Sequence, residues 1–93
     1  MAAELTYQER LNRFEIAQET IGFMMAMHTR SIDQEQKKAA PDTAVIDSLR
    51  AEFKKLADEL YYLRLKDDAT IQRVLDEYCP IVKAAYEQER AAS

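Results

Sequence analysis

The chain has 93 residues, of which 47% are hydrophobic and 32% are charged, and it contains one glycine and two prolines. So few turn residues exclude a protein of many strands and tight turns, and the apolar content excludes a disordered chain. The net charge is −4 at pH 7, with cations interleaved among anions, which argues against nucleic acid as the main ligand. We therefore predict a single all-α domain that spans residues 1–93.

The first predicted helix covers about residues 7–39. Thr6 and Glu9 have the spacing of a capping box, in which the threonine hydroxyl accepts a hydrogen bond from a backbone N–H of the first turn. Spacings of three and four residues then define one apolar stripe with two polar members: Tyr7, Leu11, Phe14, Gln18, Ile21, Met25, His28 and Ile32. A second stripe lies nearly opposite the first on the helix and consists of Ile16, Thr20, Phe23 and Met27.

The two stripes of the first helix indicate that this helix contacts more than one neighbour. A helix that is apolar on opposite sides must be covered on both sides, and one hairpin partner covers only one of them. We therefore predict an interface on the second side that involves Ile16, Phe23, Met24 and Met27, with either a second copy of the chain or another protein. The alternative is that the third helix covers this side within one chain.

The second predicted helix covers about residues 42–65. The break at 37–43 is short, so the first two helices are expected to be antiparallel neighbours. Tyr61 and Tyr62 lie off the apolar seam and predict a further contact surface near the end of this helix. The seam itself has the unbroken spacing that is typical of coiled-coil packing, and it consists of Ile46, Leu49, Phe53, Leu56, Leu60 and Leu63.

The third predicted helix covers about residues 69–90 and is capped by Asp67 or Asp68. Pro80 lies on its polar side, so the helix is expected to be kinked there, or to stop at Cys79 and restart. The predicted fold is an antiparallel helical hairpin plus a third kinked helix, as a three-helix bundle that dimerises through the long first helix. The apolar face of the third helix consists of Ile71, Val74, Leu75, Tyr78, Ile81, Val82, Ala85 and Tyr86.

Residues 21–30, IGFMMAMHTR, contain the only glycine, the only histidine and three of the four methionines of the chain. Met24 is three residues from Met27 and four from His28, a spacing at which thioethers and an imidazole converge on a soft metal such as Cu(I). The chain offers few further ligands of this kind, and methionine commonly fills gaps in cores and interfaces, so we predict no metal, no cofactor and no catalytic residue. Gly22, in mid-helix, is expected to allow the close approach of a neighbour.

The location of the protein is predicted from its cysteine content and hydropathy. The single Cys79 cannot form an internal disulfide, which suits a reducing compartment. No apolar run approaches the roughly 20 residues of a membrane-spanning helix, and the start of the chain is polar and charged, unlike a signal peptide. We predict a cytoplasmic protein without a membrane segment.

The length of the chain and the order of its helices are similar to those of the small all-helical chorismate mutases, which are entwined dimers with a long first helix. In that family, inward arginines and lysines, with a glutamine or glutamate, clamp a dicarboxylate. Arg13 and Arg30 lie off the main stripe of the first helix here, and the charged pattern of the family is not matched residue by residue. The resemblance is one of shape.

Two functions remain open from the sequence. The first is a small non-enzymatic interaction or regulatory protein, such as an adaptor, an inhibitor or an antitoxin-like protein, that acts through helical packing surfaces. The second is a dimeric small-molecule-binding protein or enzyme, with a pocket between helices lined by Gln18, His28 and a tyrosine from the second or third helix. DNA binding ranks third, because the basic residues alternate with acidic ones.

Overall fold

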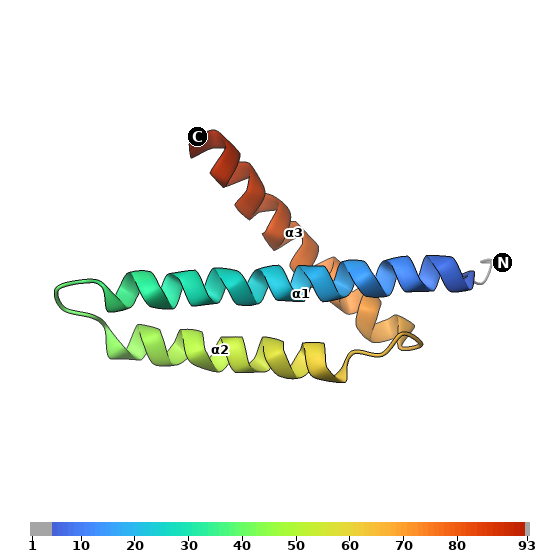
Figure 1. The fold of residues 1–93 in the computed structure, drawn as a ribbon, viewed down its shortest axis with the longest axis horizontal. Helices are drawn as coiled ribbons and strands as arrows, with labels where there is room; N and C mark the ends of the chain where they lie inside the picture. The colour runs from blue at the N-terminus through green and yellow to red at the C-terminus, as the bar shows by residue number, and fades with distance from the viewer. Residues whose placement is uncertain (1–4, 93) are drawn as a thin grey trace.

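The protein is described here by a computed structural model that covers residues 5–92. Every regular element in that range is an α-helix, which confirms the prediction of an all-α chain of three helices (Figure 1). The helices are α1 (Tyr7–Gln36), α2 (Thr43–Tyr62) and α3 (Asp68–Ala92).

A side chain caps the start of each helix. The Thr6 hydroxyl accepts a hydrogen bond from the backbone N–H of Glu9 at 3.1 Å, as the capping-box spacing predicts. The Asp42 carboxylate accepts from two backbone N–H groups of α2, at 3.0 and 3.3 Å. Before α3, Asp67 accepts from both the backbone N–H and the hydroxyl of Thr70, at 3.1 and 2.6 Å. These carboxylates and hydroxyls satisfy N–H groups that have no partner within a helix.

The first two helices end three residues before their predicted ends. The backbone of Leu63 is already extended, with φ −65° and ψ 134°, yet its side chain is buried. The apolar spacing of α2 continues through Leu63 because the spacing records burial, and a residue just beyond a helix is buried as readily as one inside it.

The long α1 is the central helix and packs against both of the others (Figure 1). The antiparallel α1–α2 hairpin is as predicted. The contacts between α1 and α3 advance along both helices in the same order: Arg10–Asp68, then Thr20–Cys79, then Arg30–Glu89. The two helices therefore run in the same direction where they cross. Within residues 5–92, the backbones of α2 and α3 do not approach each other closely, and the two helices meet through side chains.

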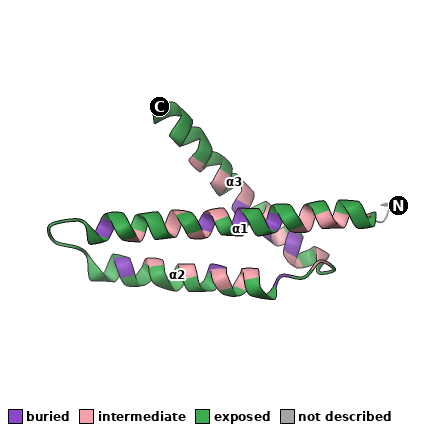
Figure 2. Ribbon diagram, in the orientation of Figure 1, coloured by how far each residue is buried: buried purple, intermediate pink, exposed green. Residues whose placement is uncertain are grey.

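The core lies where α3 crosses the hairpin (Figure 2). On α1 its centre is Ala17, Ile21 and Met24. Ile21 belongs to the first predicted stripe, whereas Ala17 and Met24 lie between the two stripes, because α2 covers one flank of this face and α3 covers the other. The buried residues from the other segments are Leu56, Leu63, Ile71, Val74 and Tyr78. No residue of α3 after Tyr78 is buried.

Pro80 lies inside α3, which is assigned as one continuous helix from Asp68 to Ala92. Pro80 is exposed, so the carbonyl that loses its backbone N–H partner four residues earlier lies towards solvent. The predicted interruption at Cys79 is therefore not found, and the kink stays a prediction.

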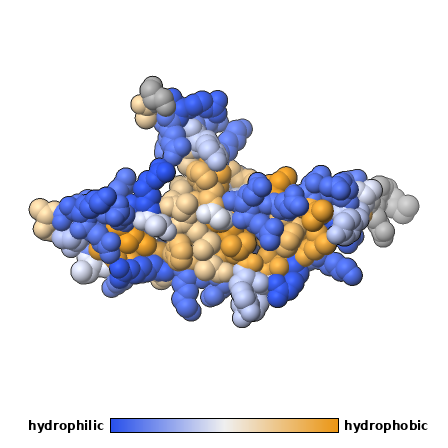
Figure 3. Space-filling model, viewed as in Figure 1, coloured by the Kyte–Doolittle hydropathy of each residue, from blue (hydrophilic) through white to orange (hydrophobic). Residues whose placement is uncertain are grey.

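The molecular surface is hydrophilic towards the ends of the helices and hydrophobic around the crossing of α3 with the hairpin (Figure 3). Ion pairs one turn apart, such as Lys37–Asp33 at 2.7 Å, lie along the outer faces of the helices. Within the described residues, the helices contain no apolar stretch long enough to cross a membrane.

Candidate functional site

The four predicted interface residues of α1 lie in different surroundings. Met24 is buried in the core, and Met27 is half-buried and packs against it. Phe23 contacts Tyr86 of α3, with ring centroids 4.7 Å apart. Ile16 remains 48% exposed. The third helix therefore covers much of the second side of α1, and Ile16 is the residue that it leaves most open.

A groove lies beside α3 where that helix crosses α1. It has a volume of about 740 Å³. Its floor includes Thr20, whose hydroxyl donates to the carbonyl of Ile16 at 2.7 Å and lies 3.6 Å from the sulfur of Cys79. The remaining lining residues come from α3 and are Val82, Lys83, Tyr86, Glu87, Glu89 and Arg90. We call this cavity the α1–α3 groove.

The opposite flank of α3 has a second hollow, of about 410 Å³. It is lined by Met27 of α1 and by Pro80, Ile81, Ala84, Ala85 and Gln88 of α3. Ile81 is 45% exposed, and Tyr86, which lines the α1–α3 groove, is 52% exposed. The second half of α3 thus has an open hollow on either side.

Tyr61 and Tyr62 lie at the end of α2, away from the lining residues of these hollows. Their side chains are 72% and 68% exposed, and their rings meet edge to face with centroids 5.0 Å apart. Tyr62 also lines a surface hollow to which Asp67 and Thr70 contribute, at the start of α3.

The two polar residues of the first stripe have different surroundings. Gln18 is exposed and lines none of the pockets described here. His28 is half-buried between α1 and α2, with Nδ1 2.7 Å from the carbonyl oxygen of Met24 and Nε2 2.7 Å from a carboxylate oxygen of Glu52. Both partners of the imidazole are hydrogen-bond acceptors, and they hold the ring in place between the two helices.

Sequence reasoning found no carboxylate partner for His28, and Glu52 is that partner. The position of the turn could have predicted this pair. His28 and Glu52 are equally far in sequence from Ala40, near the middle of the turn, and an antiparallel hairpin brings such positions opposite each other. The same rule pairs Met24 with Leu56, and both are core residues.

A small interhelical pocket adjoins the imidazole of His28. Its volume is about 250 Å³, and all three helices contribute to it. Its lining consists of Met24, His28, Glu52, Lys55, Leu56 and Tyr78. Lys55 forms no recorded hydrogen bond or ion pair within residues 5–92, so its ammonium group is available to a ligand.

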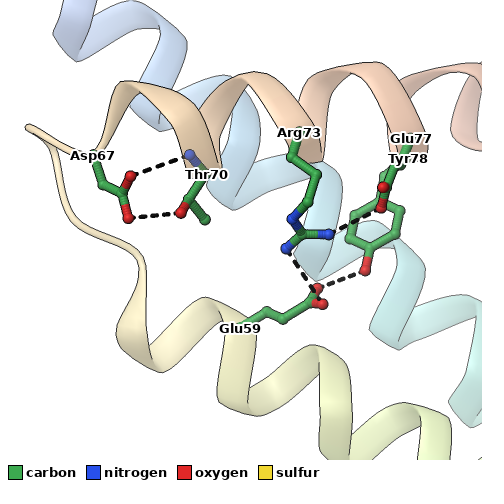
Figure 4. Close-up of polar contacts among 6 residues, drawn as sticks. All are labelled: Glu59, Asp67, Thr70, Arg73, Glu77 and Tyr78. Carbon is green, nitrogen blue, oxygen red and sulfur yellow. Dashed lines mark hydrogen bonds and ion pairs between the residues drawn. The ribbon is translucent and has the colours of Figure 1, made fainter.

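The same pocket adjoins a polar bridge between α2 and α3 (Figure 4). The Tyr78 hydroxyl donates to Glu59 at 2.6 Å, and the Arg73 guanidinium lies 3.5 Å from the other oxygen of that carboxylate. Arg73 also donates to Glu77 at 2.9 Å. Burial, and next the hydrogen bond to Glu59, raises the pKa of Tyr78 above its ordinary value. The bridge joins two helices whose backbones do not approach each other closely.

Two predictions about residues 21–30 can be compared with the structure. A Cβ added at Gly22 would meet nothing within 4 Å, so the predicted close approach of a neighbour is wrong, and Gly22 lies on the open side of α1. Met24 is occupied in the core, and both nitrogens of His28 have partners. In the described part of the chain, no group of three or more His, Cys, Asp or Glu side chains is placed to hold a metal ion.

Comparison with known proteins finds no matching family, no matching curated protein and no matching solved structure.

Proposed function

We propose that the protein is a small non-enzymatic interaction or regulatory protein, of the adaptor, inhibitor or antitoxin-like kind, that acts through helical packing surfaces. One observation carries this proposal. The second half of α3 has apolar side chains on both flanks, and Ile81 and Tyr86 among them are about half-exposed. Apolar side chains that stay exposed together on one part of a surface are typical of a binding site for another protein.

The apolar seam of α2 is not available as a binding surface for another protein. Its members Ile46, Leu56 and Leu63 are buried, and Leu49, Phe53 and Leu60 are half-buried. That seam is used within the hairpin. The α1 and α3 flanks are what remains for a partner, and Met27 among them supplies the adaptable thioether side chain that suits varied partners.

Three finer predictions belong to this proposal. Dimerisation through α1 is supported by Ile16, which stays half-exposed on that helix. A kink of α3 at Pro80 is supported by the backbone hydrogen bond that proline cannot form. A cytoplasmic location is supported by the single Cys79, which has no partner for an internal disulfide.

Site-specific photo-crosslinking tests the proposal. A benzophenone amino acid is placed at Ile81, beside α3, and in a matched control at Val45, an apolar residue of α2 that is 40% exposed. We expect a discrete protein adduct from position 81 in living cells, no such adduct from position 45, and loss of the adduct when Ile16→Asp is added. Equal adducts from both positions, or none from either, would overturn the proposal.

A second candidate function is the binding of a small carboxylate-containing molecule. The observation that favours it is the interhelical pocket, where the ammonium of Lys55 has no recorded partner in the described residues and the imidazole of His28 lines the same cavity. A volume of about 250 Å³ is enough for a small acid. Gln18, which was predicted to line such a pocket, lies outside it.

Thermal shift with a series of small mono- and dicarboxylic acids tests this candidate. Saturable stabilisation is expected from at least one acid. It should be lost in Lys55→Met, which keeps the length of the side chain, and retained in the control Lys54→Met, because Lys54 faces Asp58 at 4.0 Å and does not line the pocket. Equal shifts in both variants, or no shift with any acid, would count against it.

A further inference from the structure

The chain is more extended than a compact domain of its length. Its radius of gyration is 16.0 Å, and its extents are 57 × 31 × 18 Å. A compact domain of this length has a radius of gyration of about 12 Å. The excess arises because the hairpin is long and α3 diverges from it after the crossing (Figure 1).

The accessible surface gives the size of what is uncovered. The chain exposes 6790 Å². A compact monomer of this mass exposes about 5,500 Å², so roughly 1,200 Å² is in excess. Each partner in a stable protein–protein complex buries about 800 Å². The surplus is therefore large enough for one full interface.

Part of the exposed apolar surface lies on either side of α3. Ile16 of α1 lies one turn before Thr20, at the edge of the α1–α3 groove. Tyr86 lines the same groove, and Ile81 lines the hollow on the opposite flank. Together the two hollows extend along most of residues 79–90. A helix inserted beside α3 would cover side chains that the chain itself leaves open.

The charges around the α1–α3 groove suit a second copy of the same surface. The lining contains two cations, Lys83 and Arg90, and two anions, Glu87 and Glu89, and Glu89 is already paired with Arg30 of α1 at 3.0 Å. A two-fold axis brings a surface against itself, so a rim of balanced charge can meet opposite charges across the axis.

We propose that the α1–α3 groove and residues 79–92 of α3 form an interface between two copies of this chain. The second half of α3 from each copy covers the open flank of the other. This inference rests on the proposed function, and it names the partner as a second copy. It shifts the main dimer contact from α1 alone to α1 together with α3.

Light scattering on a sizing column, over a wide series of protein concentrations, tests the proposal. The wild-type chain is expected at twice its 10.8 kDa mass. The double variant Ile16→Asp/Ile81→Asp should run as a monomer, while the helical circular dichroism stays that of the wild type, because both residues are about half-exposed. The control Val45→Asp should remain a dimer, since an acidic residue in the first turn of α2 is favourable to the helix.

A second readout uses the natural thiol. Cys79 lines the α1–α3 groove, so it should react more slowly with a thiol reagent in the dimer than in the double variant. A monomeric wild type at every concentration would overturn the proposal, and so would a dimer that survives the double substitution. A monomer that still gives the position-81 crosslink to a different protein would refute the second copy alone and leave the proposed function in place.

Discussion

The two halves of α3 continue the same apolar pattern but lie in opposite surroundings. In the first half, Ile71, Val74 and Tyr78 are buried against the hairpin, and Glu59 is bound from α3 by two side chains. In the second half, Ile81 and Tyr86 are about half-exposed. The difference indicates that the first half of α3 stabilises the fold, whereas the second half leaves apolar side chains exposed, as the proposed interface requires.

The largest contrast is expected between two isoleucines of this helix. Ile71→Ala should lower the free energy of unfolding by about 2–5 kcal/mol, because Ile71 is fully buried and its loss leaves a cavity. Ile81→Ala should cost less than about 1 kcal/mol in a monomeric background such as Ile16→Asp, because its side chain is half-exposed. Urea denaturation measures both variants. Similar costs would contradict the division of α3.

Next in size is the polar bridge that ties the first half of α3 to α2. Tyr78→Phe removes the hydroxyl that donates to Glu59 and should cost about 1.5–3 kcal/mol, the range for a hydrogen bond to a charged group. The control Tyr61→Phe changes an exposed ring and should leave the free energy of unfolding unaltered. A wild-type stability in Tyr78→Phe would show that the bridge does not hold the helices together.

The same hydroxyl makes stability depend on alkaline pH. Burial, and then the bond to Glu59, raises the pKa of Tyr78 in the folded state above its unfolded value. Its contribution is therefore complete below the unfolded pKa, about 10, and is lost as the pH rises through the higher folded pKa. The fall in melting temperature above that pH should be smaller in Tyr78→Phe than in the wild type. Identical alkaline profiles would contradict this assignment.

A smaller gain is expected on the open side of α1. Gly22→Ala should stabilise the protein by about 0.5–1 kcal/mol, because a Cβ at this position meets nothing and alanine is the better helix former. The converse control, Ala26→Gly, is one turn away on the same exposed side and should lose a similar amount. If Gly22→Ala instead weakened dimerisation in light scattering, the interface would lie on this side of α1 and not along α3.

The smallest effect is expected at the cap of α3. Hydrogen bonds from the Thr70 side chain, and then from its backbone N–H, lower the pKa of Asp67. A carboxyl with a lowered folded pKa contributes stability above its unfolded value, and that stability is lost as the pH falls through the folded pKa. Asp67→Asn should therefore flatten the acid limb of the melting temperature against pH. An unchanged acid limb would mean that the cap adds nothing.

The sequence was sufficient for the elements and for much of their packing. The cap at Thr6, the antiparallel hairpin and the inward seam of α2 all follow from local spacing, which acts within one or two turns of helix. The two opposite stripes of α1 predicted an interface with a second copy or another protein on the second side, or, as the alternative, coverage of that side by the third helix. In the structure α1 has two neighbours within the chain, α2 and α3, which cover its two flanks, and the interface with another molecule stays a prediction.

The sequence was insufficient where the crossing angle of α3 decides the outcome. Met24 was assigned to an interface and is buried, because the buried face of α1 is centred between the two stripes. Tyr7 belongs to the first stripe and is exposed, since the apolar spacing does not say where along α1 the neighbouring helices end. The pattern of α3 is likewise uniform from Ile71 to Tyr86, although only its first half is buried.

Hydrogen exchange of the backbone amides, followed by mass spectrometry as the protein is diluted, tests the division of α3 most directly. We predict that amides of residues 79–92 lose protection on dilution and in Ile16→Asp/Ile81→Asp, whereas amides around Ile71 and Val74 keep theirs, because the latter depend on the hairpin of the same chain. Protection that is equal in both halves of α3 and independent of concentration would contradict the account.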